Sequence, residues 1–119
     1  MHNPLRFALA LAVVTVVVWA ADISGTWSFA VETDQGTGNP TFVLKQDGEK
    51  LTGTYTGILG EAKVTGTVKG DQVVIEFQGE VSGQTFKVVY SGVIESPTRM
   101  KGKVDLGGQI SGTWTATKK

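Results

Sequence analysis

The four residues Ser24-Gly25-Thr26-Trp27 recur as Ser111-Gly112-Thr113-Trp114 near the other end of the chain. Between the two copies, apolar and polar residues alternate in short runs, separated by turn-forming pairs such as Asp47-Gly48 and Gly107-Gly108. This period-two alternation is typical of strands that bury one face. The repeat at both ends predicts that the first and last strands lie side by side. The sequence therefore indicates an all-β protein whose last strand closes onto its first.

The fold class predicted by this pattern is an eight-stranded antiparallel up-and-down β-barrel, in which closure leaves no unpaired edge strand. An open two-sheet β-sandwich is the alternative architecture. The only long connection, residues 33–40, is expected to be a flexible flap at the open end of the barrel. The strands are expected at residues 23–32, 41–46, 51–59, 62–69, 73–79, 85–94, 99–106 and 110–117.

Glycines occupy the inward phase of most predicted strands, where they are expected to permit sharp bends. Gly57 and Gly79 are further expected to leave room in the lumen toward the open end. Trp27 and Trp114 are expected to be adjacent and to seal the closed end together. The inward glycines are Gly25, Gly53, Gly66, Gly79, Gly92, Gly102 and Gly112.

Residues 1–20 read as a signal peptide, so the expected domains are this signal and a single barrel domain over residues 21–119. Arg6 precedes Phe7–Trp19, which is apolar except for Thr15, and Val18-Trp19-Ala20 resembles a cleavage site. The apolar run is shorter than the about 20 residues that span a bilayer. We therefore expect a protein exported to the periplasm or the medium, without a stable membrane anchor after cleavage.

Composition argues against catalysis and against a metal or cofactor site. The chain has no cysteine, and its one histidine, His2, lies in the predicted signal. The mature protein would therefore lack the commonest general base, any thiol nucleophile and every soft metal ligand. Removal of Arg6 with the signal leaves ten basic residues against eleven acidic ones, which gives no electrostatic footprint for nucleic acid. No pattern in the sequence indicates an oligomeric state.

Gly25-Thr26-Trp27 resembles the Gly-x-Trp signature of the calycin barrels, which include lipocalins and avidins. Leu51-Thr52-Gly53-Thr54-Tyr55, after a hairpin, is similar to the second motif of avidins. The resemblance implies a structural role for Trp27 at the base of the barrel and a ligand-facing role for Tyr55. The chain also looks like small exported lipocalin-like domains of bacteria.

The chain departs from the avidin pattern at the positions that recognise biotin. Phe29 stands where avidins have a hydrogen-bonding asparagine, and Ala116 stands where a basic residue is expected. Residues 62–106 contain no tryptophan that could box a ligand. The resemblance therefore implies a barrel of this type without biotin binding.

An eight-stranded barrel either fills its interior with side chains or holds one small ligand there. If it holds one, the acidic residues Glu32, Asp34, Glu61 and Glu80 at the predicted open end disfavour carboxylates. A neutral apolar molecule is then the expected ligand, with Tyr55 the best single candidate to bind it. The alternative is a packed-core interaction or inhibitor module that acts through its outer surface or loops. The candidate ligand-binding residues are Phe29, Phe42, Tyr55, Phe77 and Phe86.

Overall fold

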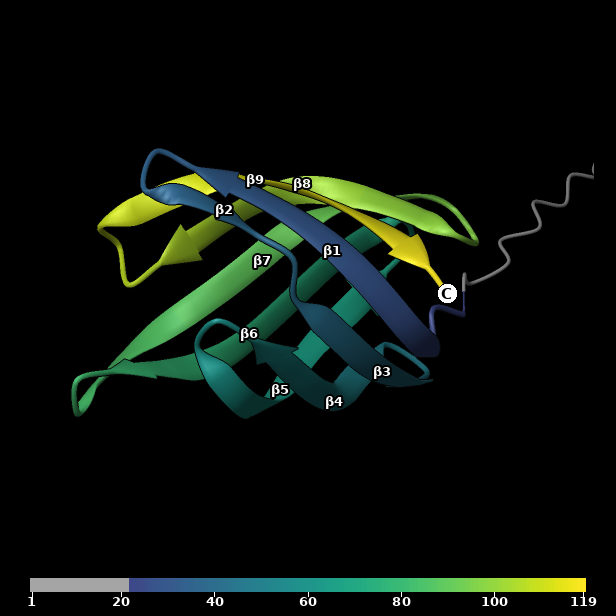
Figure 1. Cartoon of the computed structure of the whole chain (residues 1–119). Coiled ribbons are helices and arrows are strands. Elements are labelled where there is room, and N and C mark those ends of the chain that lie inside the picture. The colour runs from purple at the N-terminus through teal and green to yellow at the C-terminus, as the bar shows by residue number, and fades with distance from the viewer. Residues whose placement is uncertain (1–21) are drawn as a thin grey trace, which may run out of the picture.

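The computed structural model describes residues 22–119, which form a single antiparallel sheet rolled into a barrel (Figure 1). The predicted signal peptide lies outside the described residues. No helix occurs among the described residues, so none of them could form a membrane-spanning helix. The strands are β1 (Gly25–Thr33), β2 (Gly36–Gly38), β3 (Thr41–Asp47), β4 (Lys50–Gly57), β5 (Gly60–Lys69), β6 (Gln72–Val81), β7 (Gln84–Ser96), β8 (Arg99–Leu106) and β9 (Ile110–Lys118).

The barrel closes by pairing its first strand with its last. From β3 onward each strand pairs with the next along the chain, and β9 pairs with β1. In this last ladder Trp27 lies opposite Lys118 and Thr33 lies opposite Gly112. Figure 1 accordingly shows β9 running beside β1, with the C-terminus near the start of β1. The prediction of a closed up-and-down barrel is confirmed, and the open sandwich is excluded.

The segment between β1 and β3 is a hairpin, so the prediction of a flexible flap over residues 33–40 was wrong. β2 pairs with β1 up to Thr33 opposite Gly36, which leaves a turn of only two residues. The amide of Phe29 donates to the carbonyl of Pro40 at 3.0 Å between the β1–β2 and β1–β3 ladders. The register is continuous as well, because Val31 opposes Gly38 and Ser28 opposes Thr41. β2 and β3 therefore act as one barrel strand, interrupted where proline cannot donate to the ladder.

Burial alternates along each strand as the sequence pattern predicts. In β4, for example, Leu51 and Tyr55 are buried while Thr52 and Thr54 are exposed. Twenty apolar or aromatic side chains from all the long strands and from Ile23 form one continuous core. Within residues 22–119 no charged or other polar side chain is buried. The interior is thus a hydrophobic space whose only buried side-chain hydroxyls belong to tyrosines.

The residues before β1 plug the closed end of the barrel. The backbone amide of Ile23 donates to Oε1 of Gln46 at 2.9 Å, and the amide of Gln46 donates to Oγ of Ser24 at 2.9 Å. The indole Nε1 of Trp27 donates to the carbonyl of Ile23 at 2.9 Å. Since Ile23 and Trp27 are both fully buried, this short segment closes the base.

The expectation that Trp27 and Trp114 lie together at this end was wrong. Trp27 opposes Lys118 on β9, whereas Trp114 opposes Val31 on β1. Along β1, Trp27 and the residue opposite Trp114 are four positions apart, which corresponds to about 13 Å of strand. The rings are apart because β9 continues past Trp114 to the base of the barrel. Trp114 instead stacks on Phe29 in the middle of the interior, with ring centroids 4.9 Å apart.

Five inward glycines allow close contact between neighbouring strands. A Cβ atom at Gly53 would overlap the backbone carbonyl oxygen of Val43, and one at Gly102 would overlap that of Ser91. No side chain fits there, whatever its size. A backbone carbonyl oxygen of the neighbouring strand occupies the Cβ position in the same way at five glycines: Gly53, Gly66, Gly92, Gly102 and Gly112.

We expect Gly53→Ala to lower the free energy of unfolding by roughly 3 kcal/mol or more, because β3 would have to move away from β4. Gly38→Ala is the matched control, since a Cβ atom at Gly38 meets nothing within 4 Å. It should change stability by no more than about 0.5 kcal/mol. Urea unfolding followed by tryptophan fluorescence measures both; equal effects would contradict the close-packing assignment.

A double-mutant cycle tests the separation of the two tryptophans. Trp27→Phe and Trp114→Phe should each destabilise by about 1–3 kcal/mol, because each removes the indole donor from a buried or partly buried carbonyl. The carbonyls belong to Ile23 and Lys103, respectively. Because the rings do not touch, the effects should add to within about 0.5 kcal/mol. A larger coupling energy would place the rings in contact.

Candidate functional site

A cavity of about 180 Å³ lies at the open end of the barrel, between the mouths of the hairpins. Its walls come from β1, β4, β7, β8 and β9 and from the hairpin that carries β2. No charged residue lines it. The lining residues are Val31, Thr33, Gln35, Gly36, Thr37, Gly38, Asn39, Pro40, Tyr55, Ile58, Leu59, Tyr90, Leu106 and Ile110. We refer to this space as the mouth cavity.

Six aromatic rings fill the middle of the barrel and form a packed cluster. Ring centroids of contacting pairs lie between 4.3 Å (Tyr55 on Phe77) and 6.3 Å (Phe77 on Tyr90). These distances are those of well-packed aromatic pairs. The tyrosines belong both to this cluster and to the wall of the mouth cavity. The cluster consists of Phe29, Phe42, Tyr55, Phe77, Tyr90 and Trp114.

The structure brings four of the five predicted ligand-binding residues together. Phe29, Phe42, Tyr55 and Phe77 are buried in the aromatic cluster. Among the five, only Tyr55 also lines the mouth cavity. Phe86 is half-buried and packs at the edge of the core, outside the cluster. Ligand contact by these five residues stays a prediction.

The two glycines that were expected to leave space toward the open end do not leave it empty. A Cβ atom at Gly57 would come within 2.6 Å of the Tyr55 hydroxyl oxygen. A Cβ atom at Gly79 would lie 3.0 Å from ring carbons of Phe86. Each missing side chain is thus replaced by an aromatic ring from a neighbouring position. The mouth cavity arises higher up, where the hairpins splay apart.

The mouth cavity is lined by polar side chains of residues 33–39, which are exposed or half-buried, and by two buried tyrosines that carry hydroxyls. The hydroxyl of Tyr55 accepts a long hydrogen bond of 3.4 Å from the amide of Leu59. The hydroxyl of Tyr90 makes no hydrogen bond to any residue that the structure describes, although Tyr90 is only 4% exposed. Burial raises the pKa of Tyr90 far above its ordinary value, and the nearby Tyr55 raises it further. Burial also raises the pKa of Tyr55, opposed by the hydrogen bond from Leu59.

Sequence reasoning missed several residues of this site. Tyr90 lies on the inward phase of its strand and carries a polar atom, a signal that was available from the sequence. Leu106 and Ile110 flank the glycine turn between β8 and β9, so their joint position follows only from the hairpin register. Leu59 continues the inward phase of the predicted strand over residues 51–59, but it lies in the β4–β5 turn and was not chosen as a candidate.

The rim of the mouth combines exposed acids with apolar turn residues. Glu32, Asp34, Glu61 and Glu80 are all exposed on or beside the open-end hairpins. Ile58, at the tip of the β4–β5 turn, is 90% exposed. Within residues 22–119 no group of three metal-ligating side chains comes together. The rim thus disfavours anions at the entrance.

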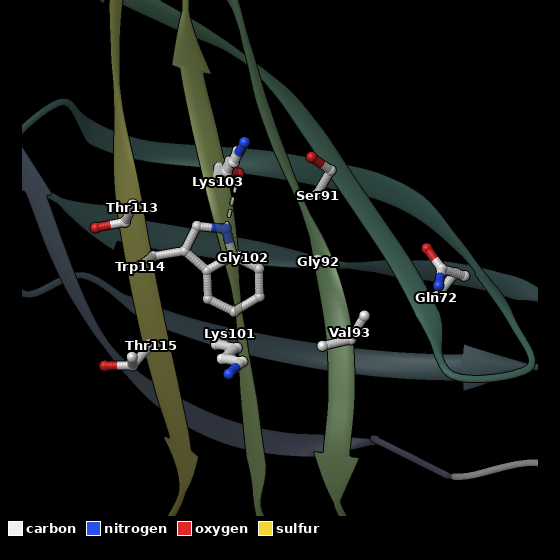
Figure 2. A pocket seen from close by; sticks show the side chains of 10 residues that line it. All are labelled: Gln72, Ser91, Gly92, Val93, Lys101, Gly102, Lys103, Thr113, Trp114 and Thr115. Atoms are coloured by element: carbon white, nitrogen blue, oxygen red, sulfur yellow. Dashed lines mark hydrogen bonds between the residues drawn. The ribbon is translucent and has the colours of Figure 1, made fainter.

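A second, larger depression lies on the outer face of β7, β8 and β9 (Figure 2). It measures about 540 Å³ and exists because Gly92 and Gly102 face each other across two strands. Outward side chains such as Lys101 and Thr113 flank it, and the floor is glycine backbone with the indole of Trp114 beneath. The indole is 2% exposed, and its Nε1 already donates to the carbonyl of Lys103 at 2.8 Å. Figure 2 shows the polar side chains of Ser91, Thr113 and Thr115 spread around this depression and not pointing toward one another, so the mouth cavity is the stronger candidate.

The sequence matches no known protein-family profile and no curated protein. Several solved barrels are similar in structure. The redesigned β-barrel b11L5F_LGL has a TM-score of 0.68 at 18% identity, over 82% of this chain and 91% of that one. The redesigned barrel mFAP1, bound to DFHBI, has a TM-score of 0.62 at 16% identity, over 82% and 94%. A de novo designed fluorescence-activating β-barrel has a TM-score of 0.62 at 15% identity, over 87% and 100%. At these identities the similarity establishes the fold.

The raised pKa of Tyr90 predicts that stability falls in strong alkali. The unfolded chain loses the phenolic proton near pH 10, whereas the folded protein keeps it. The contribution of Tyr90 to the free energy of unfolding is therefore fully present below pH 10. It is lost as the pH rises above 10, by up to about 1.4 kcal/mol per pH unit for one proton. Urea unfolding of wild type and Tyr90→Phe between pH 8 and 11.5 measures it. The variant should show a shallower decline, and parallel curves would contradict the assignment.

Proposed function

We propose that this chain is an exported binding barrel that holds a small, neutral, mainly apolar molecule in its mouth cavity. The observation that carries the proposal is an uncharged cavity with two tyrosine hydroxyls above a packed aromatic floor. Ligand sites usually combine apolar walls with a few placed polar groups. The cavity, at about 180 Å³, is smaller than the about 300–1,000 Å³ of drug-sized sites. The ligand should therefore be small.

The structural neighbours support binding by this fold. mFAP1 and EF1p2_mFAP2b, which share the barrel, are described bound to DFHBI. The Gly25-Thr26-Trp27 and Leu51–Tyr55 motifs add a resemblance to calycin barrels. The Trp27 ring at the base and the Tyr55 ring facing the interior are consistent with the roles that this resemblance implies. We therefore propose that the chain acts as a lipocalin-like carrier that does not bind biotin.

Export rests on the sequence of residues 1–20. A charged start, a short apolar run and small residues before Ala21 are together typical of a signal peptide. The absence of cysteine from the chain agrees with a barrel that is held by packing alone. The intact mass of material from the periplasm and the medium tests this proposal. The expected mass is that of Ala21–Lys119; a membrane species that retains Met1 would contradict it.

We assign a binding role rather than a catalytic one. The ionisable groups of the mouth cavity are Tyr55 and Tyr90, and burial raises the pKa of both. A general base or an activated nucleophile needs a pKa shifted toward neutrality. Two neutral phenols can orient a ligand but cannot take up its proton at neutral pH.

A second candidate function is an interaction module that acts through the open-end turns. Ile58 is 90% exposed and Val81 is 52% exposed, and both lie at this end. Exposed apolar side chains such as these could contribute to a contact with another protein if they form one continuous patch. This alternative requires no ligand in the cavity, and the following titration separates the two.

Titration with ethylbenzene, followed by amide NMR spectra, tests the binding function. Saturable shifts are expected at Leu59, Leu106 and Ile110, because these residues line the cavity. Ile110→Trp should fill the cavity and weaken binding at least tenfold. Thr113→Trp, on the same strand but beside the outer depression, is the control and should bind like wild type. Shifts confined to the outer face, or no saturation, would favour the interaction module.

A further inference from the structure

Tyr90 is a buried polar group without a partner in the described part of the chain. Its ring is surrounded by those of Phe42, Phe29 and Trp114, with centroids 5.2, 5.6 and 5.9 Å away. Carbon rings accept hydrogen bonds only weakly, and the indole N–H of Trp114 already donates to the carbonyl of Lys103. A buried hydroxyl without a partner is destabilising, so phenylalanine would suit the core better at this position. Because Tyr90 borders the mouth cavity, the cavity is where its hydroxyl can find a partner.

Tyr55 brings a second hydroxyl to the same cavity. Its oxygen accepts the amide proton of Leu59, which leaves its own proton free to be donated. The rings of Tyr55 and Tyr90 both stack on Phe77, with centroids 4.3 and 6.3 Å away, and both residues line the same cavity. Because burial keeps both phenols protonated, each offers one O–H donor at any physiological pH.

We propose that the hydroxyls of Tyr55 and Tyr90 form a two-donor site for the carbonyl oxygen of a small ketone, aldehyde or amide. This inference rests on the proposed binding function and specifies its ligand class. A carbonyl oxygen has two lone pairs and can accept from both donors. A carboxylate is disfavoured, because no cationic side chain lines the cavity and acidic residues surround its rim.

The remainder of the ligand should be apolar and face the aliphatic wall. Leu59, Leu106 and Ile110 line the cavity alongside the tyrosines, whereas its other polar side chains, from residues 33–39, are exposed or half-buried and can be hydrated. A carbonyl compound with a phenyl or branched alkyl group matches this division between two hydroxyls and a hydrocarbon wall. Acetophenone is such a molecule. Ethylbenzene has nearly the same shape without the oxygen, and 1-phenylethylammonium carries a cationic donor in its place.

The experiment compares the dissociation constants of these three compounds by amide NMR titration. Two hydrogen bonds of ordinary strength predict that acetophenone binds wild type about tenfold more tightly than ethylbenzene. Tyr90→Phe should reduce this preference to threefold or less while leaving ethylbenzene affinity within twofold. The C=O stretching band of bound acetophenone should lie at lower frequency in wild type than in Tyr90→Phe.

Stability measurements separate a ligand-binding hydroxyl from a structural one. Tyr90→Phe should melt at or above the wild-type temperature, since it removes a polar group that has no protein partner. Thr113→Val, which removes a hydroxyl from the outer face, is the control and should keep the full preference for acetophenone. A lower melting temperature for Tyr90→Phe would assign its hydroxyl to the core and overturn the inference.

The remaining outcomes are also decisive. Equal affinity for ethylbenzene and acetophenone overturns the two-donor site but leaves the binding function intact. Tighter binding of 1-phenylethylammonium than of acetophenone overturns the carbonyl assignment in favour of a cationic ligand. Saturation by none of the three overturns both this inference and the proposed function.

Discussion

The backbone ladder between β1 and β9 is the contact on which the rest of this structure depends. It joins the two ends of the described chain, and it continues past the strands where the amide of Lys119 donates to the carbonyl of Thr26 at 2.8 Å. β1 is bonded on its other edge to β2 and β3, so the run of ladders from β3 to β9 returns to β1, and among the described strands only the short β2 pairs with a single neighbour. The apolar faces of all the strands then enclose one space. With no cysteine available, these ladders and the packing inside them hold the domain together.

Closure divides the interior into a filled zone and an open one. At mid-height the cluster of six aromatic side chains occupies the lumen. At the base, Ile23 and Trp27 seal it. Toward the mouth, aliphatic side chains such as Leu59, Leu106 and Ile110 and polar side chains of residues 33–39 surround a small cavity. The barrel therefore combines a packed core with a space that can hold a ligand. Most of the barrel is packed, and only its upper end can hold a ligand.

Tyrosine, rather than phenylalanine, at the boundary between these zones gives the cavity its chemical character. Both rings contribute to the cluster as a phenylalanine would, and the hydroxyls add polarity that the core does not require. The cost of burying the Tyr55 hydroxyl is offset in part by the hydrogen bond that it accepts from the amide of Leu59. Tyr90 has no such compensation within residues 22–119. A buried hydroxyl that the described protein groups do not satisfy needs another partner, such as an ordered water or a ligand in the cavity.

The sequence by itself determined the strand pattern, the inward phase, the closure of the barrel and the burial of Trp27 and Trp114. The strand pattern and the inward phase follow from a period of two and from turn residues, and closure was predicted from the repeat of Ser24–Trp27 as Ser111–Trp114. It also indicated Tyr55 as a cavity residue. Only the tertiary structure decided how far Trp27 lies from Trp114, because ladder register depends on where β9 ends. It likewise decided that rings of Tyr55 and Phe86 occupy the space beside Gly57 and Gly79. The mouth cavity and the isolated Tyr90 hydroxyl depend on side chains from strands distant in sequence, whose joint packing no local pattern encodes.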